Sequence, residues 1–223
     1  MATITEKREV RDFNEVALQG YGELIVEQSA DPAAVESLVI EADKDLLPML
    51  RTDVRDGRLI LRQEAPWWNP AYWIDWLFMD KRLLYRVSMV QVNGVSISGS
   101  GTARASRIHS DNCNLRISGS GKFVFEGLEV NSLTTDISGS GRMELSGKVG
   151  QYAILISGSG TVQAAGLETQ ETKVRISGSG NARVNASQAL EVTISGSGDV
   201  RYTGSPKVTK SISGAGRVRQ ASE

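Results

Sequence analysis

Serine is the residue type with side-chain chemistry that repeats at fixed positions in this chain. Each copy of the pentapeptide Ile-Ser-Gly-Ser-Gly contributes two serines. The copies begin at Ile97, Ile117, Ile137, Ile156, Ile176 and Ile194, and a copy with alanine as its fourth residue begins at Ile212. An array of stacked hydroxyl groups could bind a flat ligand. We favour the simpler interpretation that the serines hydrogen-bond along the stack and to the backbone of the bends.

The other groups that could react or bind a metal are too few to form a site. His109 is the single histidine, and its neighbours Ser110 and Asp111 do not make a catalytic triad, because a triad is defined by the geometry of residues from separate elements. We expect His109 to be exposed to solvent. Cys113 is the single cysteine, and we expect a small, partly buried side chain. One histidine and one cysteine encode no zinc cluster, so we predict no metal and no cofactor.

Carboxylates in the repeats give weak grounds for a glycan-cleaving enzyme. Such enzymes need two carboxyl groups close to the bond that is cleaved. Asp136, Glu144 and Glu126 come nearest to this arrangement but occupy different positions in their repeats. The recurring Gly-x-Gly also lacks the strand and helix that flank a phosphate-binding loop. We therefore predict no catalytic residues and no enzymatic activity, with a carbohydrate-binding or carbohydrate-active β-helix as the alternative.

The pentapeptides recur every 18 to 20 residues, which is typical of a solenoid. Apolar residues alternate with polar ones on both sides of the two glycines, so each copy predicts two short strands joined by a bend. Parallel stacking places each isoleucine on the next, whereas a hairpin meander gives no reason for identical bends. The sequence therefore predicts an all-β fold, a parallel β-helix with coils of about 20 residues.

The N-terminal part predicts a less regular continuation of the same fold. Residues 16–27 fit the frame of the repeats, with Leu18 in the place of the isoleucine. We divide the chain into an irregular β region at residues 1–92 and a regular β-helix of seven repeats at residues 93–223. The last repeat has Gln220 where an apolar residue is expected, and polar or charged edges discourage further strand addition.

Residues 66–80 form an insert that holds all four tryptophans of the chain. Large aromatic residues are enriched where one protein binds another and where a chain meets lipid headgroups. The alternative is a loop that folds back and caps the solenoid. Because the interior of the coils is already filled, we predict that the insert projects and forms a homo-oligomer contact or, failing that, a membrane-surface contact. The predicted interaction residues are Trp67, Trp68, Tyr72, Trp73, Trp76, Leu77 and Phe78.

The charge balance excludes one class of partner and leaves the location open. The formal net charge is -1, from 25 basic and 26 acidic residues, so we predict no nucleic-acid partner. No apolar signal segment opens the chain. We expect the cell envelope or surface if a leader has been removed, and the cytoplasm otherwise.

The repeated pentapeptide, together with the earlier segment Phe13-Asn-Glu-Val-Ala-Leu-Gln-Gly-Tyr-Gly-Glu-Leu-Ile-Val-Glu, resembles the bacterial family called the putative auto-transporter adhesin head GIN domain. The resemblance extends from about residue 13 to residue 219. It implies a right-handed β-helix, an envelope setting and an adhesin-like role. The family has no established catalytic residues to carry over.

These observations predict a non-enzymatic structural or adhesin-like module that displays a binding face. The segments between successive coils are polar and differ from one another, and solenoids usually place their binding side chains on such a face. A glycan is one partner that the stacked face could contact. The segments are residues 106–112, 126–132, 146–151 and 166–172.

Overall fold

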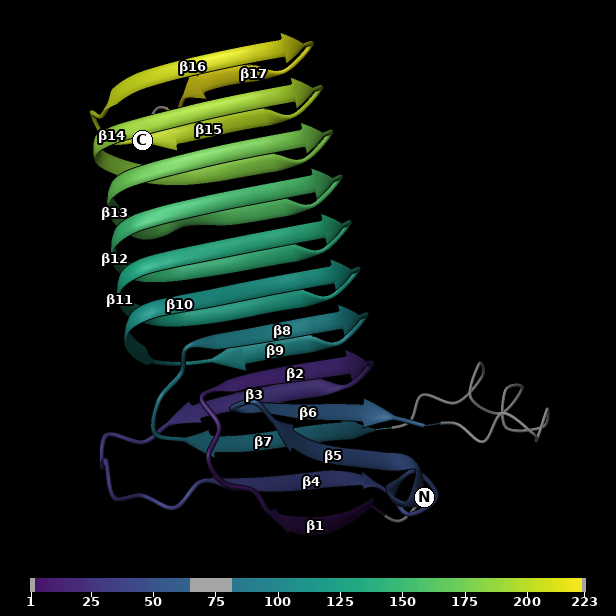
Figure 1. The fold of residues 1–223 in the computed structure, drawn as a ribbon. Helices are drawn as coiled ribbons and strands as arrows, with labels where there is room; N and C mark the ends of the chain where they lie inside the picture. The colour runs from purple at the N-terminus through teal and green to yellow at the C-terminus, as the bar shows by residue number, and fades with distance from the viewer. Residues whose placement is uncertain (1–2, 65–81, 222–223) are drawn as a thin grey trace, which may run out of the picture.

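The computed structural model describes residues 3–64 and 82–221, and its strands belong to one hydrogen-bonded sheet that winds into a stack of coils (Figure 1). The N-terminal elements are β1 (Thr3–Glu9), β2 (Glu15–Gly20), β3 (Glu23–Gln28), β4 (Ser37–Asp43), the 3₁₀ turn η1 (Leu47–Met49), β5 (Leu50–Arg55), β6 (Arg58–Gln63) and β7 (Leu83–Met89). The later strands are β8 (Gly94–Gly99), β9 (Thr102–Ala105), β10 (Ile108–Gly119), β11 (Lys122–Gly139), β12 (Arg142–Gly158), β13 (Thr161–Gly178), β14 (Asn181–Gly196), β15 (Asp199–Thr203), β16 (Lys207–Gly214) and β17 (Arg217–Gln220). The predicted β-solenoid is confirmed.

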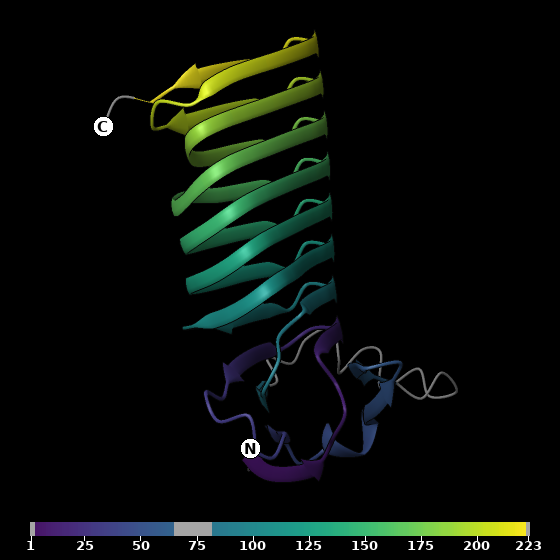
Figure 2. The ribbon, with the colours of Figure 1, turned by 60° about the vertical axis from the view of Figure 1, so that its left-hand side comes forward.

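The repeats stack in parallel and in register. Ile117 pairs with Ile97 on one side and with Ile137 on the other, and the alignment continues to Ile212. Each coil has a first arm that leads into the pentapeptide and a second arm that follows it. Long strands such as β11 run from the second arm of one coil, through a wide bend, into the first arm of the next. The pentapeptide corners lie above one another along one edge of the stack (Figures 1 and 2).

Glycine is needed at both positions of the corner, for two different reasons. Gly139 has a φ of 125°, and a Cβ there would lie 2.6 Å from the carbonyl oxygen of Gly119. A Cβ at Gly141 would lie 2.6 Å from Cγ2 of Ile117, a core side chain of the neighbouring coil. The N–H of Ser140 donates to the carbonyl oxygen of Gly119 (2.9 Å), which continues the ladder through the corner. Close approach of successive coils therefore explains why the pentapeptide is repeated.

The interior is filled by the inward side chains of both arms. The stacked isoleucines are buried, and the rings of Phe123 and Phe125 pack edge to face with centroids 5.2 Å apart. Fully burying one such side chain stabilises the fold by about 2 to 3 kcal/mol. The hydroxyl of Tyr152 lies 3.2 Å from Oγ1 of Thr135, so this polar pair is satisfied inside the core. The apolar stack is therefore the main source of stability.

The N-terminal region begins with one further coil, as the repeat frame predicted. Strand β2 pairs with β8 and places Leu18 in register with Ile97, while β3 pairs with β9 and places Leu24 in register with Ala103. On the other side of this coil, β6 runs parallel to β2 and β7 runs parallel to β3. The connection from β6 to β7 therefore occupies the place in the chain that a pentapeptide corner has in later coils.

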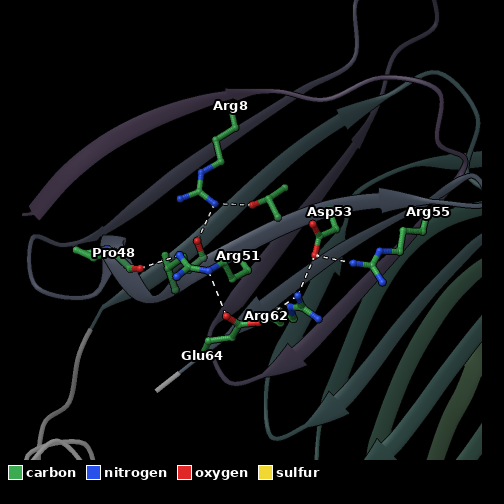
Figure 3. Close-up of polar contacts among 9 residues, drawn as sticks. Arg8, Pro48, Arg51, Asp53, Arg55, Arg62 and Glu64 are labelled. Carbon is green, nitrogen blue, oxygen red and sulfur yellow. Dashed lines mark hydrogen bonds and ion pairs between the residues drawn. The ribbon is translucent and has the colours of Figure 1, made fainter. Parts of the chain in front are cut away.

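Antiparallel strands close the N-terminal end of the stack. Strand β4 pairs with β7, β1 pairs with β4, and β5 pairs with β6. Arg8 on β1 links the two outermost strands, because its Nη1 donates to the carbonyl oxygen of Leu50 (3.0 Å) and to Oγ1 of Thr52 (2.7 Å) on β5 (Figure 3). Strands β1 and β5, which do not pair with each other, are thereby joined at this end.

Candidate functional site

The tryptophan-rich insert cannot be placed from the described residues. All of its predicted interaction residues lie outside them, namely Trp67, Trp68, Tyr72, Trp73, Trp76, Leu77 and Phe78. The described chain shows only how β6 ends. Oε1 of Gln63 accepts from the N–H of Tyr21 (3.1 Å), and Nε2 of Gln63 donates to the carbonyl oxygen of Tyr21 (2.8 Å). The Gln63 side chain thus binds the corner of the neighbouring coil.

The serine ladders face solvent along the corner edge. Both serines of each pentapeptide are exposed, as at Ser138 and Ser140. Within residues 82–221, backbone N–H groups make the hydrogen bonds of the corners, and the hydroxyls of the pentapeptide serines make none within the protein. The interpretation that these hydroxyls bond along the stack is therefore wrong for the described residues. The serines are free to contact water or a ligand.

His109, Ser110 and Asp111 are adjacent in sequence but have separate partners. The His109 side chain is 80% exposed, with Nδ1 3.6 Å from Oε2 of Glu129. Oγ of Ser110 donates to the carbonyl oxygen of Asn112 (2.9 Å), which leaves the histidine without a link to a serine nucleophile. The expectation of a solvent-exposed histidine is confirmed.

The buried thiol and the repeat carboxylates show no arrangement suited to catalysis. Burial raises the pKa of Cys113 to about 12, so the unreactive protonated thiol prevails at neutral pH. Asp136 lies 3.6 Å from Arg116 on a first arm, whereas Glu144 lies 2.9 Å from Lys122 on a second arm. Within residues 3–64 and 82–221, no three His, Cys, Asp or Glu side chains are grouped so that they could hold a metal ion.

A groove is lined by residues of the wide bends of the solenoid. In Figure 1 these bends lie on the side of the stack opposite the pentapeptide corners. It has a volume of about 570 Å³ and crosses five successive strands, β10 to β14. Its charged groups include Glu129, Lys148 and Glu168, and Nζ of Lys148 lies 3.8 Å from Oε2 of Glu168. Asn131 and Gln170 add amide groups. The groove therefore offers donors and acceptors from several coils to one ligand.

Hydrogen bonds beneath the groove hold its floor in place. Oγ1 of Thr169 donates to the carbonyl oxygen of Asn185 (2.6 Å) and lies 2.6 Å from Oγ1 of Thr172. Oγ of Ser187 donates in turn to the carbonyl oxygen of Thr169 (3.0 Å). At the bend, Nδ2 of Asn131 donates to Oδ1 of Asp111 on the previous coil (2.7 Å). These contacts fix the spacing of the groove side chains before any ligand binds.

A second hollow continues the groove toward the N-terminal coil. The two share the segment from His109 to Asp111, and the second is lined by amide side chains that include Gln91, Asn93 and Asn114. Gln28 anchors the join, because its Oε1 accepts from the N–H of His109 (2.7 Å) and its Nε2 donates to the carbonyl oxygen of His109 (2.9 Å). The two hollows therefore form one polar surface along the bends.

Comparison with known proteins gives a family match over most of the chain. Residues 12–206 match the family model described as "Putative auto-transporter adhesin, head GIN domain". The chain belongs to this family. No curated protein matches the chain. Membership confirms the resemblance that the repeats suggested, and an adhesin family is compatible with a location at the cell envelope or surface.

Solved structures share the fold of this GIN domain over nearly its whole length. A putative adhesin from Bacteroides fragilis superposes with a TM-score of 0.85 at 22% identity, covering 99% of this chain and 97% of that one. A putative lipid binding protein from Parabacteroides distasonis gives 0.77 at 21% identity, with 99% and 97% covered. A putative adhesin from Parabacteroides merdae gives 0.67 at 23% identity, with 99% and 96% covered. At these identities the likeness shows the fold alone.

The groove of this GIN domain lies on the segments that the sequence marked as variable, but its individual residues were not predicted. The sequence did contain a signal for the groove, because most of the groove lining comes from the variable segments 106–112, 126–132, 146–151 and 166–172. Among residues 3–64 and 82–221, no helix is long and apolar enough to cross a membrane.

Proposed function

We propose that this GIN domain is a non-enzymatic, adhesin-like module that binds its ligand in the groove of the bends. The observation that carries the proposal is a single groove built from five coils whose bend segments differ in sequence. Such a surface can vary in specificity from one family member to another without a change in the solenoid. The adhesin description of the family and a location at the cell envelope fit this role.

The chemistry of the groove favours a carbohydrate as the ligand. Amides and carboxylates such as Asn131, Gln170 and Glu168 can donate to and accept from the closely spaced hydroxyls of a sugar. Binding rather than cleavage is proposed, because Asp136 and Glu144 each contact a basic side chain and lie on different arms. The repeat carboxylates therefore do not form the close pair that glycoside hydrolysis uses.

Binding to an array of immobilised glycans tests this function. The groove variant Asn131→Ala with Gln170→Ala should weaken binding of an uncharged glycan retained on the array about tenfold or more, since each lost hydrogen bond costs about 1 kcal/mol. The matched control is Gln163→Ala with Asn181→Ala, which removes two amides from the outer face of the second arms. Equal losses in both variants, or no glycan bound by the wild-type protein, would contradict the proposal.

We also propose that the tryptophan-rich insert drives self-assembly. Four tryptophans in 15 residues carry more apolar surface than a monomer usually leaves in water, and burying one aromatic side chain is worth about 2 to 3 kcal/mol. A homo-oligomer is favoured over a membrane surface, because no run of basic residues for anionic lipid flanks the insert.

Light scattering on the purified protein tests the assembly. The variant Trp73→Ser with Trp76→Ser should lower the measured mass to that of a monomer and leave the β-sheet circular dichroism unchanged. A wild-type monomer, or a variant that remains assembled, would contradict self-assembly through the insert. Unfolding of the variant would show that the insert caps the solenoid instead.

A further inference from the structure

Three arginines form an adjacent column on the outer face of the second arms near the C-terminal end. Arg183 on β14 pairs in register with Arg201 on β15, and Arg201 pairs with Arg219 on β17. All three side chains are exposed. Because neighbouring strands lie about 4.8 Å apart, the column presents a guanidinium group at each step along the solenoid axis.

The same column is neutralised in the earlier coils. Further toward the N-terminus it contains Arg86 and Arg104, separated by an apolar residue of β3. Arg86 lies 2.9 Å from Oε1 of Glu27, and Arg104 lies 2.6 Å from Oε1 of Glu23. These cations are therefore already paired within the protein.

The C-terminal column has no such partners. Within residues 3–64 and 82–221, no carboxylate forms an ion pair with Arg183, Arg201 or Arg219. Asp199 is the carboxylate at a neighbouring outward position on β15, and it too forms no ion pair. Like charges placed directly opposite each other in a sheet are destabilising. Three stacked cations without a carboxylate thus work against the stability of the fold and call for another explanation.

Protection of the sheet edge explains only part of this column. Charged side chains on an edge strand discourage pairing with other chains, which accounts for Arg219 on β17. Arg183 and Arg201 lie on β14 and β15, which are both paired on either side. The protein as a whole has a formal net charge of -1, so the cations are concentrated locally. Residues 199–221 contain five basic residues and one acidic residue.

We propose that the column of Arg183, Arg201 and Arg219 binds the carboxylate or sulfate groups of a linear anionic polysaccharide. A guanidinium group binds such oxyanions through two parallel hydrogen bonds, and its charge persists at every physiological pH. A ligand with charges repeated along its length fits cations repeated along a straight axis.

Two other polyanions fit the face less well. Single-stranded nucleic acids stack their bases on aromatic side chains, and the outward positions of β14, β15 and β17 hold none. A lipid surface is bound by basic residues together with apolar ones that enter the bilayer, and the outward positions next to the column, Asn181, Asp199 and Arg217, are polar or charged. The site lies on a different face from the groove of the bends, so it goes beyond the proposed function and does not depend on it.

Fluorescence anisotropy with labelled heparin and labelled polygalacturonate tests the site, with heparin reporting sulfate and polygalacturonate reporting carboxylate recognition. The variant Arg183→Gln, Arg201→Gln and Arg219→Gln should raise the dissociation constant at least tenfold. It should also lower the slope of log Kd against log salt by about 2 to 3, one for each lost contact. The groove variant Asn131→Ala with Gln170→Ala should bind these probes as the wild type does.

The control removes the same charge from elsewhere. Arg107→Gln, Arg116→Gln and Arg175→Gln change the net charge equally but leave the column intact, so the dissociation constant should change less than twofold. An equal loss in this control would overturn the site, as would a wild-type protein that binds neither polysaccharide. Tighter binding of a single-stranded oligonucleotide or of anionic phosphatidylserine vesicles would show that the ligand class is wrong. Loss of binding by one probe alone would identify which anionic group the column accepts.

Discussion

The two ends of the solenoid differ in how the core and the edge strands of the end coil are protected. At the N-terminal end, the antiparallel strands β1, β4 and β5 cover the first coil, and Arg8 ties β1 to β5. At the C-terminal end, β16 and β17 form the last described coil, and Ile212 is 38% exposed although its counterparts are buried. Within residues 3–64 and 82–221, further strands cover the first coil, whereas no strand covers the last coil, whose outward side chains are polar. A stack therefore needs protection at its ends but not one particular kind of cap.

The largest test compares equivalent isoleucines in a middle coil and in the open end coil. Ile137→Ala removes a fully buried side chain and should lower the free energy of unfolding by about 3 kcal/mol. Ile212→Ala should cost less than about 1.5 kcal/mol, because its side chain is partly in water already. Urea denaturation followed by circular dichroism measures both. Equal costs would show that the C-terminal end is covered in solution.

The next test opens the closed end. Arg8→Ala removes the donor to Leu50 and Thr52, and since charged hydrogen bonds are worth about 1.5 to 3 kcal/mol, we expect a loss of about 2 kcal/mol. Arg51→Ala is the matched control, because Arg51, like Arg8, donates to a carboxylate and to a backbone carbonyl, but its side chain is 51% exposed (Figure 3). It should cost less than about 1 kcal/mol. Similar costs would mean that the link between β1 and β5 does not hold the end closed.

The closed end should also respond to alkaline pH. Burial raises the pKa of Tyr85 on β7 to about 12, from 10.0 in the unfolded chain. The ionisation of Tyr85 leaves the free energy of unfolding unchanged below about pH 10. The free energy of unfolding then falls as the pH rises towards 12, because the tyrosine loses its proton first in the unfolded state. At pH 11 the loss should be about 1.4 kcal/mol relative to pH 8. Tyr85→Phe should remove this part of the pH dependence, and an unchanged profile would contradict it.

The sequence predicted the stack better than its ends. The register of the repeats follows from residues such as Gly139 and Ile137, whose roles recur in each coil and can be read from the spacing alone. The closure by Arg8 depends on a contact across 42 residues between two strands that have no repeat, so no local pattern reveals it.

The candidate surfaces differ in the same way. The bend segments were predicted to carry binding side chains, but the groove depends on how neighbouring bends pack. The arginine column has a signal in the sequence, since Arg183, Arg201 and Arg219 are separated by 18 residues each, which is the period of the last coils. The interaction residues of the insert lie outside the described chain, and their role stays a prediction.

The last prediction concerns the C-terminal end coil. We expect the smallest change in stability there, together with a change in assembly. Lys210 takes the register position that the buried Val192 has in the coil before it, so a charged side chain stands where the core would otherwise continue. Inward charges of this kind prevent sheets from joining edge to edge. Lys210→Val should alter the free energy of unfolding by less than about 1 kcal/mol, because the position is exposed. It should nevertheless promote end-to-end association, seen as a mass that rises with protein concentration in sedimentation equilibrium.

Lys207→Val, an exposed change on the same strand, is the control and should leave the concentration dependence as in the wild type. If both variants associate equally, the added surface hydrophobicity causes the association, and the inward lysine is not what keeps these ends apart.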